Sequence, residues 1–248
     1  MSNDSRVDDY VLCDDEHGLM DAINAINLCS QIIFDCEGQN LGREGGSLSL
    51  MSFRTIEPEI PKTYLIDVLS FTNDTLRPVF DIIQSSSPTK IVFDGRMDYA
   101  ELFHGKGIPI RGVLDLQLAD IHSRRPRGED EEDQRRRLSP YFKRGDVYGN
   151  PACYRQVHKL CSLEQCLREH EIDSEIQFDH IQGNNNSVNR QQSPLTRPSV
   201  DHQLWLKRPL PEKYLRYAAW DVYSIALLYN DFKDEGYITS PLSAQSER

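Results

Sequence analysis

The chain has 248 residues, of which 38% are hydrophobic and 27% charged, and its formal net charge is −11. This length suits one large domain or one domain with insertions, and the composition excludes collagen, a coiled coil and a small disulfide-stabilised protein. No apolar stretch is long enough to cross a membrane, and the negative charge is the wrong sign for binding phosphates by bulk electrostatics.

The N-terminal residues do not have the pattern of a secretory signal, so we expect an intracellular protein, cytoplasmic or nuclear, that does not contact membranes. In that environment the six cysteines are expected to be reduced. One run combines His158, Cys161, Cys166 and His170. Its spacing is not that of a standard zinc site, so we expect buried free thiols, with structural zinc as the weaker alternative.

Strand and helix patterns alternate over the first 120 residues. Short apolar runs predict strands at 10–13, 32–34, 48–53, 64–68 and 91–93. Apolar residues at helical spacing, together with capping signals, predict helices at 16–27, 76–84, 98–103 and 116–122. This alternation indicates an α/β sheet with helices on both faces.

Two segments interrupt the pattern. Residues 124–137 contain six arginines, five acidic residues and no apolar side chain, which predicts a solvated, disordered insertion whose deletion leaves the fold intact. Residues 182–202 are rich in Asn, Gln and Ser and form a second break. Order returns between them at 160–170, and residues 211–232 predict one long amphipathic helix.

Four carboxylates lie at the ends of predicted core elements. Asp35 and Glu37 follow an apolar strand, and residues two apart on a strand point to the same side. Two like charges in one place repel each other unless a cation lies between them. Asp98 opens a helix, where a capping role is the alternative, and Asp221 lies one helical turn after Tyr217.

The order of these motifs resembles the DnaQ-like 3′–5′ exonuclease superfamily, in its tyrosine-type DEDD branch. The motifs are FDCEGQNLGREGGSLSLMSF at 34–53, IVFDGRMDYAELF at 91–103, VLDLQLAD at 113–120, WLKRPL at 205–210 and YAAWD at 217–221. The nearest relatives are expected among RNase D and Egalitarian-type exonuclease domains. The resemblance implies an α/β, RNase H-like fold: a central mixed sheet of five to six strands, flanked by helices and carrying two long loop insertions.

The resemblance also implies a domain layout. The exonuclease domain would span residues 10–235, with insertions at about 124–156 and 173–203. Residues 1–9 and 236–248 would be tails.

The chemistry implied by the resemblance is two-metal hydrolysis. Two ions, Mg²⁺ or Mn²⁺, would be held by Asp35, Glu37, Asp98 and Asp221, with Asp35 bridging both; an all-oxygen ligand set suits these ions and disfavours zinc. Tyr217 would orient the attacking water. The substrate would be the 3′ end of a single-stranded nucleic acid, RNA favoured over DNA, and the products nucleoside 5′-monophosphates.

Three assignments remain open in the sequence. Asp94 competes with Asp98 as the ligand of the second motif; we prefer Asp98, because the family places its ligand before an apolar pair such as 102–103. Leu41 matches the apolar residue that wedges between terminal bases in related exonucleases, or it covers the core. Arg208 would contact a substrate phosphate, or it is a solvated charge before a proline.

The competing function belongs to another class. Some Egalitarian-type relatives bind nucleic acid or act as scaffolds without catalysis, and the two insertions could bind a protein partner in RNA silencing or decay. Such proteins typically have degraded ligand carboxylates, whereas all four are intact here. We therefore expect an active exonuclease.

Overall fold

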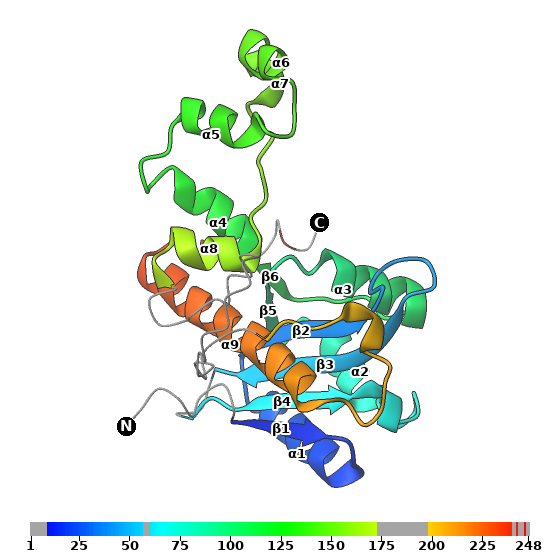
Figure 1. The fold of residues 1–248 in the computed structure, drawn as a ribbon. Helices are drawn as coiled ribbons and strands as arrows, with labels where there is room; N and C mark the ends of the chain where they lie inside the picture. The colour runs from blue at the N-terminus through cyan, green and yellow to red at the C-terminus, as the bar shows by residue number, and fades with distance from the viewer. Residues whose placement is uncertain (1–8, 57–59, 173–197, 240–241, 243–245, 247–248) are drawn as a thin grey trace, which may run out of the picture.

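The computed structural model describes residues 9–56, 60–172, 198–239, 242 and 246. Its centre is a mixed sheet of six strands in the order β1-β4-β3-β2-β5-β6, which agrees with the mixed sheet of five to six strands that the family resemblance implies (Figure 1). The strands are β1 (Tyr10–Cys13), β2 (Gln31–Gln39), β3 (Ser47–Thr55), β4 (Thr63–Asp67), β5 (Thr89–Val92) and β6 (Val113–Asp115). β2, β3 and β4 pair antiparallel, while the pairs β1–β4, β2–β5 and β5–β6 are parallel.

Helices cover both faces of this sheet. The α-helices are α1 (Glu16–Asn27), α2 (Arg77–Gln84), α3 (Arg96–Ala100), α4 (Leu116–Arg124), α5 (Glu131–Leu138), α6 (Arg144–Gly149), α7 (Pro151–Tyr154), α8 (Leu163–Glu169) and α9 (Glu212–Asp234). The described residues also include 3₁₀-helices η2 (Val68–Ser70) and η5 (His202–Leu204), and a π-helical turn η3 (Glu101–Gly105) that continues α3. In the described part of the chain, no helix is long and apolar enough to cross a membrane.

Side chains of β2 alternate between two cores. Phe34 and Cys36 belong to the core that packs under α1 and α2, whereas Ile33 belongs to the core formed with α4, α8 and α9. Because successive strand residues point to opposite faces, Asp35 and Glu37 lie on the same face as Ile33, toward α9. The long helix α9 packs against this face and buries most of its residues (Figure 1).

The segment 124–137 is folded, so the predicted disorder is wrong. Asp130 caps α5 in a reciprocal capping box with Asp133, and the acidic first turn and basic last turn of this helix suit its dipole. Helices α5, α6 and α7 rise away from the sheet as a projection at the top of Figure 1. Most of the second predicted insertion, 173–203, lies outside the described residues.

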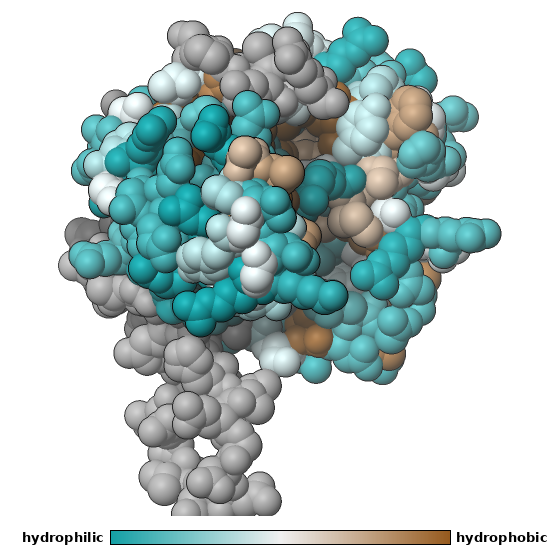
Figure 2. All heavy atoms as spheres, turned by 90° about the horizontal axis from the view of Figure 1, so that it is seen from above, coloured by the Kyte–Doolittle hydropathy of each residue, from teal (hydrophilic) through white to brown (hydrophobic). Residues whose placement is uncertain are grey.

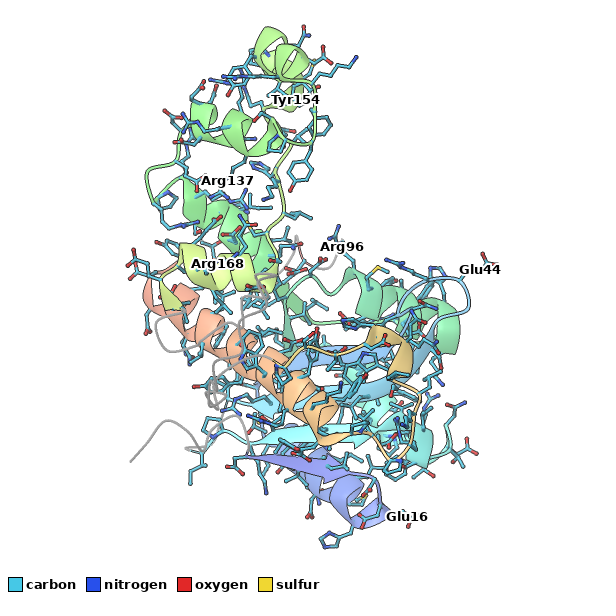
Figure 3. The ribbon with its side chains drawn as sticks, viewed as in Figure 1. Glu16, Glu44, Arg96, Arg137, Tyr154 and Arg168 are labelled. Atoms are coloured by element: carbon cyan, nitrogen blue, oxygen red, sulfur yellow. The ribbon has the colours of Figure 1, made fainter. Side chains whose placement is uncertain are left out.

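Ion pairs replace apolar packing at the base of this projection. Asp120 of α4 is completely buried, and Arg124 and Arg127 bind its carboxylate at 2.6 and 3.4 Å. Arg137 of α5 bridges Glu129 and Glu169 at 2.5 and 2.8 Å (Figure 3). Burial would raise the pKa of Asp120, but a hydrogen bond from His170 and the charge of Arg124 outweigh it and lower that pKa to about 2.

We expect the double variant Arg124→Ala/Arg127→Ala to lower the free energy of unfolding by about 3 kcal/mol, because it leaves Asp120 buried without a guanidinium partner. Arg136→Ala/Arg168→Ala is the matched control: it removes two exposed ion pairs, Arg136–Asp133 and Arg168–Glu164, and should change stability by less than about 1 kcal/mol. Urea unfolding of both variants measures the difference. If the two variants are equally stable, the ion pairs of residues 124–137 do not stabilise the fold, and the prediction that this segment can be deleted would hold.

Candidate active site

Three carboxylates from two elements meet at one place. Asp35 and Glu37 project from β2, and Asp221 projects from α9, which crosses the same face of the sheet. Each of the three offers an oxygen, and these oxygens lie within 4.8 Å of one another. The strand periodicity and the helical turn therefore bring together the three acidic residues that the sequence places in its first and third motifs.

This cluster is poorly hydrated. Glu37 and Asp221 are each only 7% exposed, and Asp35 is half-buried. Three carboxylates this close repel one another in a medium of low dielectric constant, unless they take up protons or share a cation. An all-oxygen set of this kind matches the preference of Mg²⁺ and Mn²⁺ rather than that of zinc.

Asp98 lies beside the three-carboxylate cluster rather than in it. It is buried on α3, and its Oδ1 accepts the backbone N–H of Cys36 at 3.1 Å. β5 pairs with β2 only as far as Ile33, so β5 offers no carbonyl to the backbone N–H of Cys36. The Asp98 carboxylate accepts this N–H instead. Burial raises the pKa of Asp98 to about 7, and the hydrogen bond from Cys36 works in the opposite direction.

Because the pKa of Asp98 is raised, we expect Asp98→Asn to increase the stability of the metal-free protein, measured with a metal chelator present, at neutral pH. In the folded state the carboxyl prefers its protonated form, so its ionisation destabilises the fold progressively as the pH rises from about 4 to about 7. Asn can still accept the Cys36 N–H and carries no charge. We therefore expect the variant to unfold like wild type near pH 4 and to be more stable, by roughly a few kcal/mol, above pH 7. Urea unfolding at both pH values checks this; a variant less stable than wild type above pH 7 would contradict it.

Tyr217 lies one turn before Asp221 on α9 and is buried. Its ring makes edge contacts with His202 and Trp205, at centroid distances of 5.8 and 5.9 Å. Trp205 donates its indole N–H to Nδ1 of His202 at 3.2 Å. Side chains at the start of and just before the WLKRPL segment therefore pack against the Tyr217 ring.

Arg208 pairs with acceptors inside the protein. Its guanidinium forms a bidentate ion pair with the buried Asp67, at 2.6 and 2.7 Å, and donates to Ser49 and to the carbonyls of Trp205 and Lys207. All its N–H groups are directed at protein acceptors. Arg208 therefore joins the WLKRPL segment to β3 and β4; its contact with a substrate phosphate stays a prediction.

The two other open assignments have clear positions. Asp94 follows β5 with a positive φ of 58°, and its carboxylate pairs with Arg96 instead of joining the cluster. Leu41 lies in the turn after β2, half-buried against the core under α1 and α2. Its loop is held by Glu101, whose carboxylate accepts the Gly42 N–H at 2.9 Å.

Sequence reasoning missed Glu101 and His202. Glu101 is buried three residues after Asp98, on the same side of the helical segment, and that spacing is the signal that could have found it. His202 precedes Trp205 in a segment with no helical or strand periodicity, so no sequence pattern indicates its contact with Tyr217.

Two residues of the weaker zinc alternative, Cys166 and His170, belong to a second group of donor atoms. Asp120, Cys166 and His170 offer atoms within 4.8 Å of one another. The Asp120 carboxylate is already paired with Arg124 and Arg127, so the charge that would attract a cation is balanced by the protein. All six cysteines are free thiols, and Cys153 alone among them is exposed.

Comparisons with known proteins agree with the fold and with the motif order. A family model described as 3′–5′ exonuclease matches residues 10–236. No curated protein sequence matches the chain. The structure is similar to that of Trypanosoma brucei RNase D in complex with RNA U12, with 21% identity and a TM-score of 0.59, over 92% of this chain and 64% of that one.

Two further solved structures share the fold. Escherichia coli RNase D has 18% identity and a TM-score of 0.52, and the match covers 96% of this chain and 51% of that one. The EXO domain of Aedes aegypti Nibbler has 16% identity and a TM-score of 0.51, over 92% of this chain and 88% of that domain. The chain thus spans less than two-thirds of either RNase D chain and nearly the whole Nibbler domain.

Proposed function

The chain belongs to the 3′–5′ exonuclease family, and from that membership we propose that it hydrolyses single-stranded nucleic acid from the 3′ end, with divalent metal ions, to nucleoside 5′-monophosphates. The observation that carries this proposal is the three-carboxylate cluster of Asp35, Glu37 and Asp221, with oxygens within 4.8 Å of one another. Residues 10–235 would form the catalytic domain.

The donor set of the site suits the proposed ions. Asp35, Glu37 and Asp221 would hold them, and Asp98 would complete the set from α3. Two Mg²⁺ or Mn²⁺ ions bound there would activate water and stabilise the leaving oxygen of the phosphodiester. The buried positions of Glu37 and Asp221 favour this arrangement, because a bound cation stabilises carboxylates that are largely removed from water.

Tyr217 and Leu41 would position the reactants. The Tyr217 hydroxyl, one helical turn from Asp221, would orient the attacking water by a hydrogen bond. Leu41 would contact the terminal bases from the loop that Glu101 fixes through Gly42. The similar T. brucei RNase D structure contains RNA, which supports RNA over DNA as the substrate.

Labelled oligonucleotides test this proposal. With Mn²⁺ present, single-stranded RNA labelled at its 5′ end should shorten one nucleotide at a time, while RNA labelled at its 3′ end should release the labelled mononucleotide first. A blocked 3′ end should prevent both, and DNA of the same sequence should be degraded more slowly. Internal cleavage products would show an endonuclease instead, and binding without cleavage would favour the scaffold alternative.

A further inference from the structure

A basic and aromatic helical arm projects from the exonuclease fold. The helical arm comprises residues 139–159, with α6, α7 and part of the irregular segment that returns to α8 (Figure 1). It carries four basic residues, Lys143, Arg144, Arg155 and Lys159, against a single acidic residue, Asp146. The chain as a whole carries −11, so the helical arm is a positive region on a negative protein.

Aromatic side chains lie among these cations. Tyr141 and Phe142 are 64% and 44% exposed at the start of the helical arm. The Phe142 ring contacts that of Tyr154 at a centroid distance of 5.4 Å, and the Arg144 guanidinium lies over the ring of Tyr148 at 5.5 Å. Figure 2, seen from the side on which the helical arm projects, shows a mostly hydrophilic surface with only scattered hydrophobic residues.

The helical arm is fixed in place rather than loosely tethered. Gln134 of α5 donates to the carbonyls of Tyr154, Arg155 and Val157, so α5 is bound to the segment that returns to α8. Val147 of α6 is buried. Tyr154 lies on the helical arm beyond Arg137, whose double ion pair anchors α5 to α8 (Figure 3). Exposed aromatic rings and cations are thus held in a set arrangement before any ligand binds.

We propose that the helical arm is a second binding surface for the single-stranded substrate, and that it holds nucleotides upstream of the 3′ end while the end itself occupies the carboxylate cluster. This inference rests on the proposed function for the identity of the strand. Alternating aromatic and basic side chains are the chemistry by which proteins bind single strands without sequence preference: the rings stack on bases and the cations pair with phosphates.

An acidic protein segment fits the helical arm less well. Carboxylates of such a partner would pair with the four cations but would not stack on the exposed rings of Tyr141 and Phe142. A nucleic acid strand uses both. It also explains how a chain of net charge −11 retains a polyanion: the positive charge is concentrated on one projection, away from the acidic site.

Two triple variants, each of which loses three positive charges, distinguish a specific contribution of the helical arm to RNA binding from the effect of the net charge of the protein. Lys143→Gln/Arg144→Gln/Arg155→Gln neutralises three exposed cations of the helical arm, and Lys62→Gln/Arg77→Gln/Lys233→Gln neutralises three exposed cations elsewhere. Binding of 5′-labelled RNA is measured by fluorescence anisotropy in EDTA, so that no hydrolysis occurs, with strands of roughly 4 and roughly 20 nucleotides. Circular dichroism checks that each variant is folded.

The helical-arm variant should bind the long strand roughly tenfold more weakly than wild type and the short strand equally well. Its slope of log K against log salt concentration should be shallower by about 2, since each phosphate contact of a single strand contributes about 0.7. Tyr141→Ala should weaken binding of the long strand alone. The control triple should match wild type on both strands.

Cys153 gives an independent, local readout. It lies on α7 and is the exposed cysteine, the other five being buried, so a thiol reagent should label it selectively. The long RNA should slow this labelling, and the short RNA or an acidic peptide should not.

Three results would overturn the inference: unchanged affinity of the helical-arm variant for the long strand, an equal loss in the control triple, or protection of Cys153 by the acidic peptide and not by RNA. Because binding is measured without turnover, these results are independent of catalysis. A chain that binds through the helical arm but never cleaves would refute the proposed function alone.

Discussion

Asp221→Asn is expected to lower the turnover of single-stranded RNA by about 10³-fold or more. The variant keeps the size and shape of the side chain on α9 and removes one of the three charges of the carboxylate cluster. Mn²⁺ affinity, measured by isothermal titration, should fall together with turnover. The apo protein should stay folded, because removal of one charge relieves repulsion among buried carboxylates.

Asp94→Asn is the matched control for this substitution. Asp94 is also an aspartate beside the site, but its carboxylate pairs with Arg96 and not with the cluster. Asn tolerates the positive φ of 58° that this position requires. Turnover and Mn²⁺ affinity close to wild type are expected for Asp94→Asn, and a loss equal to that of Asp221→Asn would mean that the ligands of the second motif are assigned wrongly.

Tyr217→Phe is expected to lower turnover by roughly 10²–10⁴-fold while Mn²⁺ affinity and strand affinity stay unchanged. The ring remains packed against His202 and Trp205, so only the hydroxyl is lost. Single-turnover kinetics with saturating strand isolate this step. If the tyrosine only packs, Phe should support nearly the wild-type rate.

Tyr214→Phe is the matched control, because it removes a tyrosine hydroxyl of α9 that stabilises the fold but is not expected to orient the attacking water. The Tyr214 hydroxyl lies nearly one turn before Tyr217 and donates to the carbonyl of Asp201 at 2.9 Å. Its removal should lower the free energy of unfolding by about 1 kcal/mol and leave turnover unchanged. Equal kinetic losses in both phenylalanine variants would indicate that each disturbs α9 rather than the chemistry.

Local periodicity was enough to predict five of the six strands and to place Asp35 and Glu37 on one face of β2. Alternation along β2 places Asp35 and Glu37 on one face of the sheet. The four-residue spacing places Tyr217 and Asp221 on one face of the helix α9. Their meeting in space depends on α9 crossing the sheet, a tertiary relation that the motif order indicated only through the family resemblance. The structure then shows three of the four acidic residues with oxygens within 4.8 Å of one another.

Charged residues were the least predictable from sequence. Residues 124–137 look solvated because they contain no apolar side chain, yet Arg124 is buried on a carboxylate from the preceding turn of α4. Arg208 seemed free to bind phosphate, but its partner Asp67 lies 141 residues away. The sequence identifies each charged residue, but the partner with which that residue pairs depends on the tertiary fold.

Divalent ions at the carboxylate cluster are expected to drive hydrolysis. The decisive measurement follows 5′-labelled single-stranded RNA incubated with wild type and with Asp221→Asn, each with Mn²⁺, with Mg²⁺ and with excess EDTA. We predict stepwise shortening by wild type in either metal, none in EDTA, restoration when metal is added back, and shortening by Asp221→Asn that is slower by about 10³-fold or more in either metal. Full activity of wild type in excess EDTA, or of Asp221→Asn in Mn²⁺, would contradict the assignment of this site.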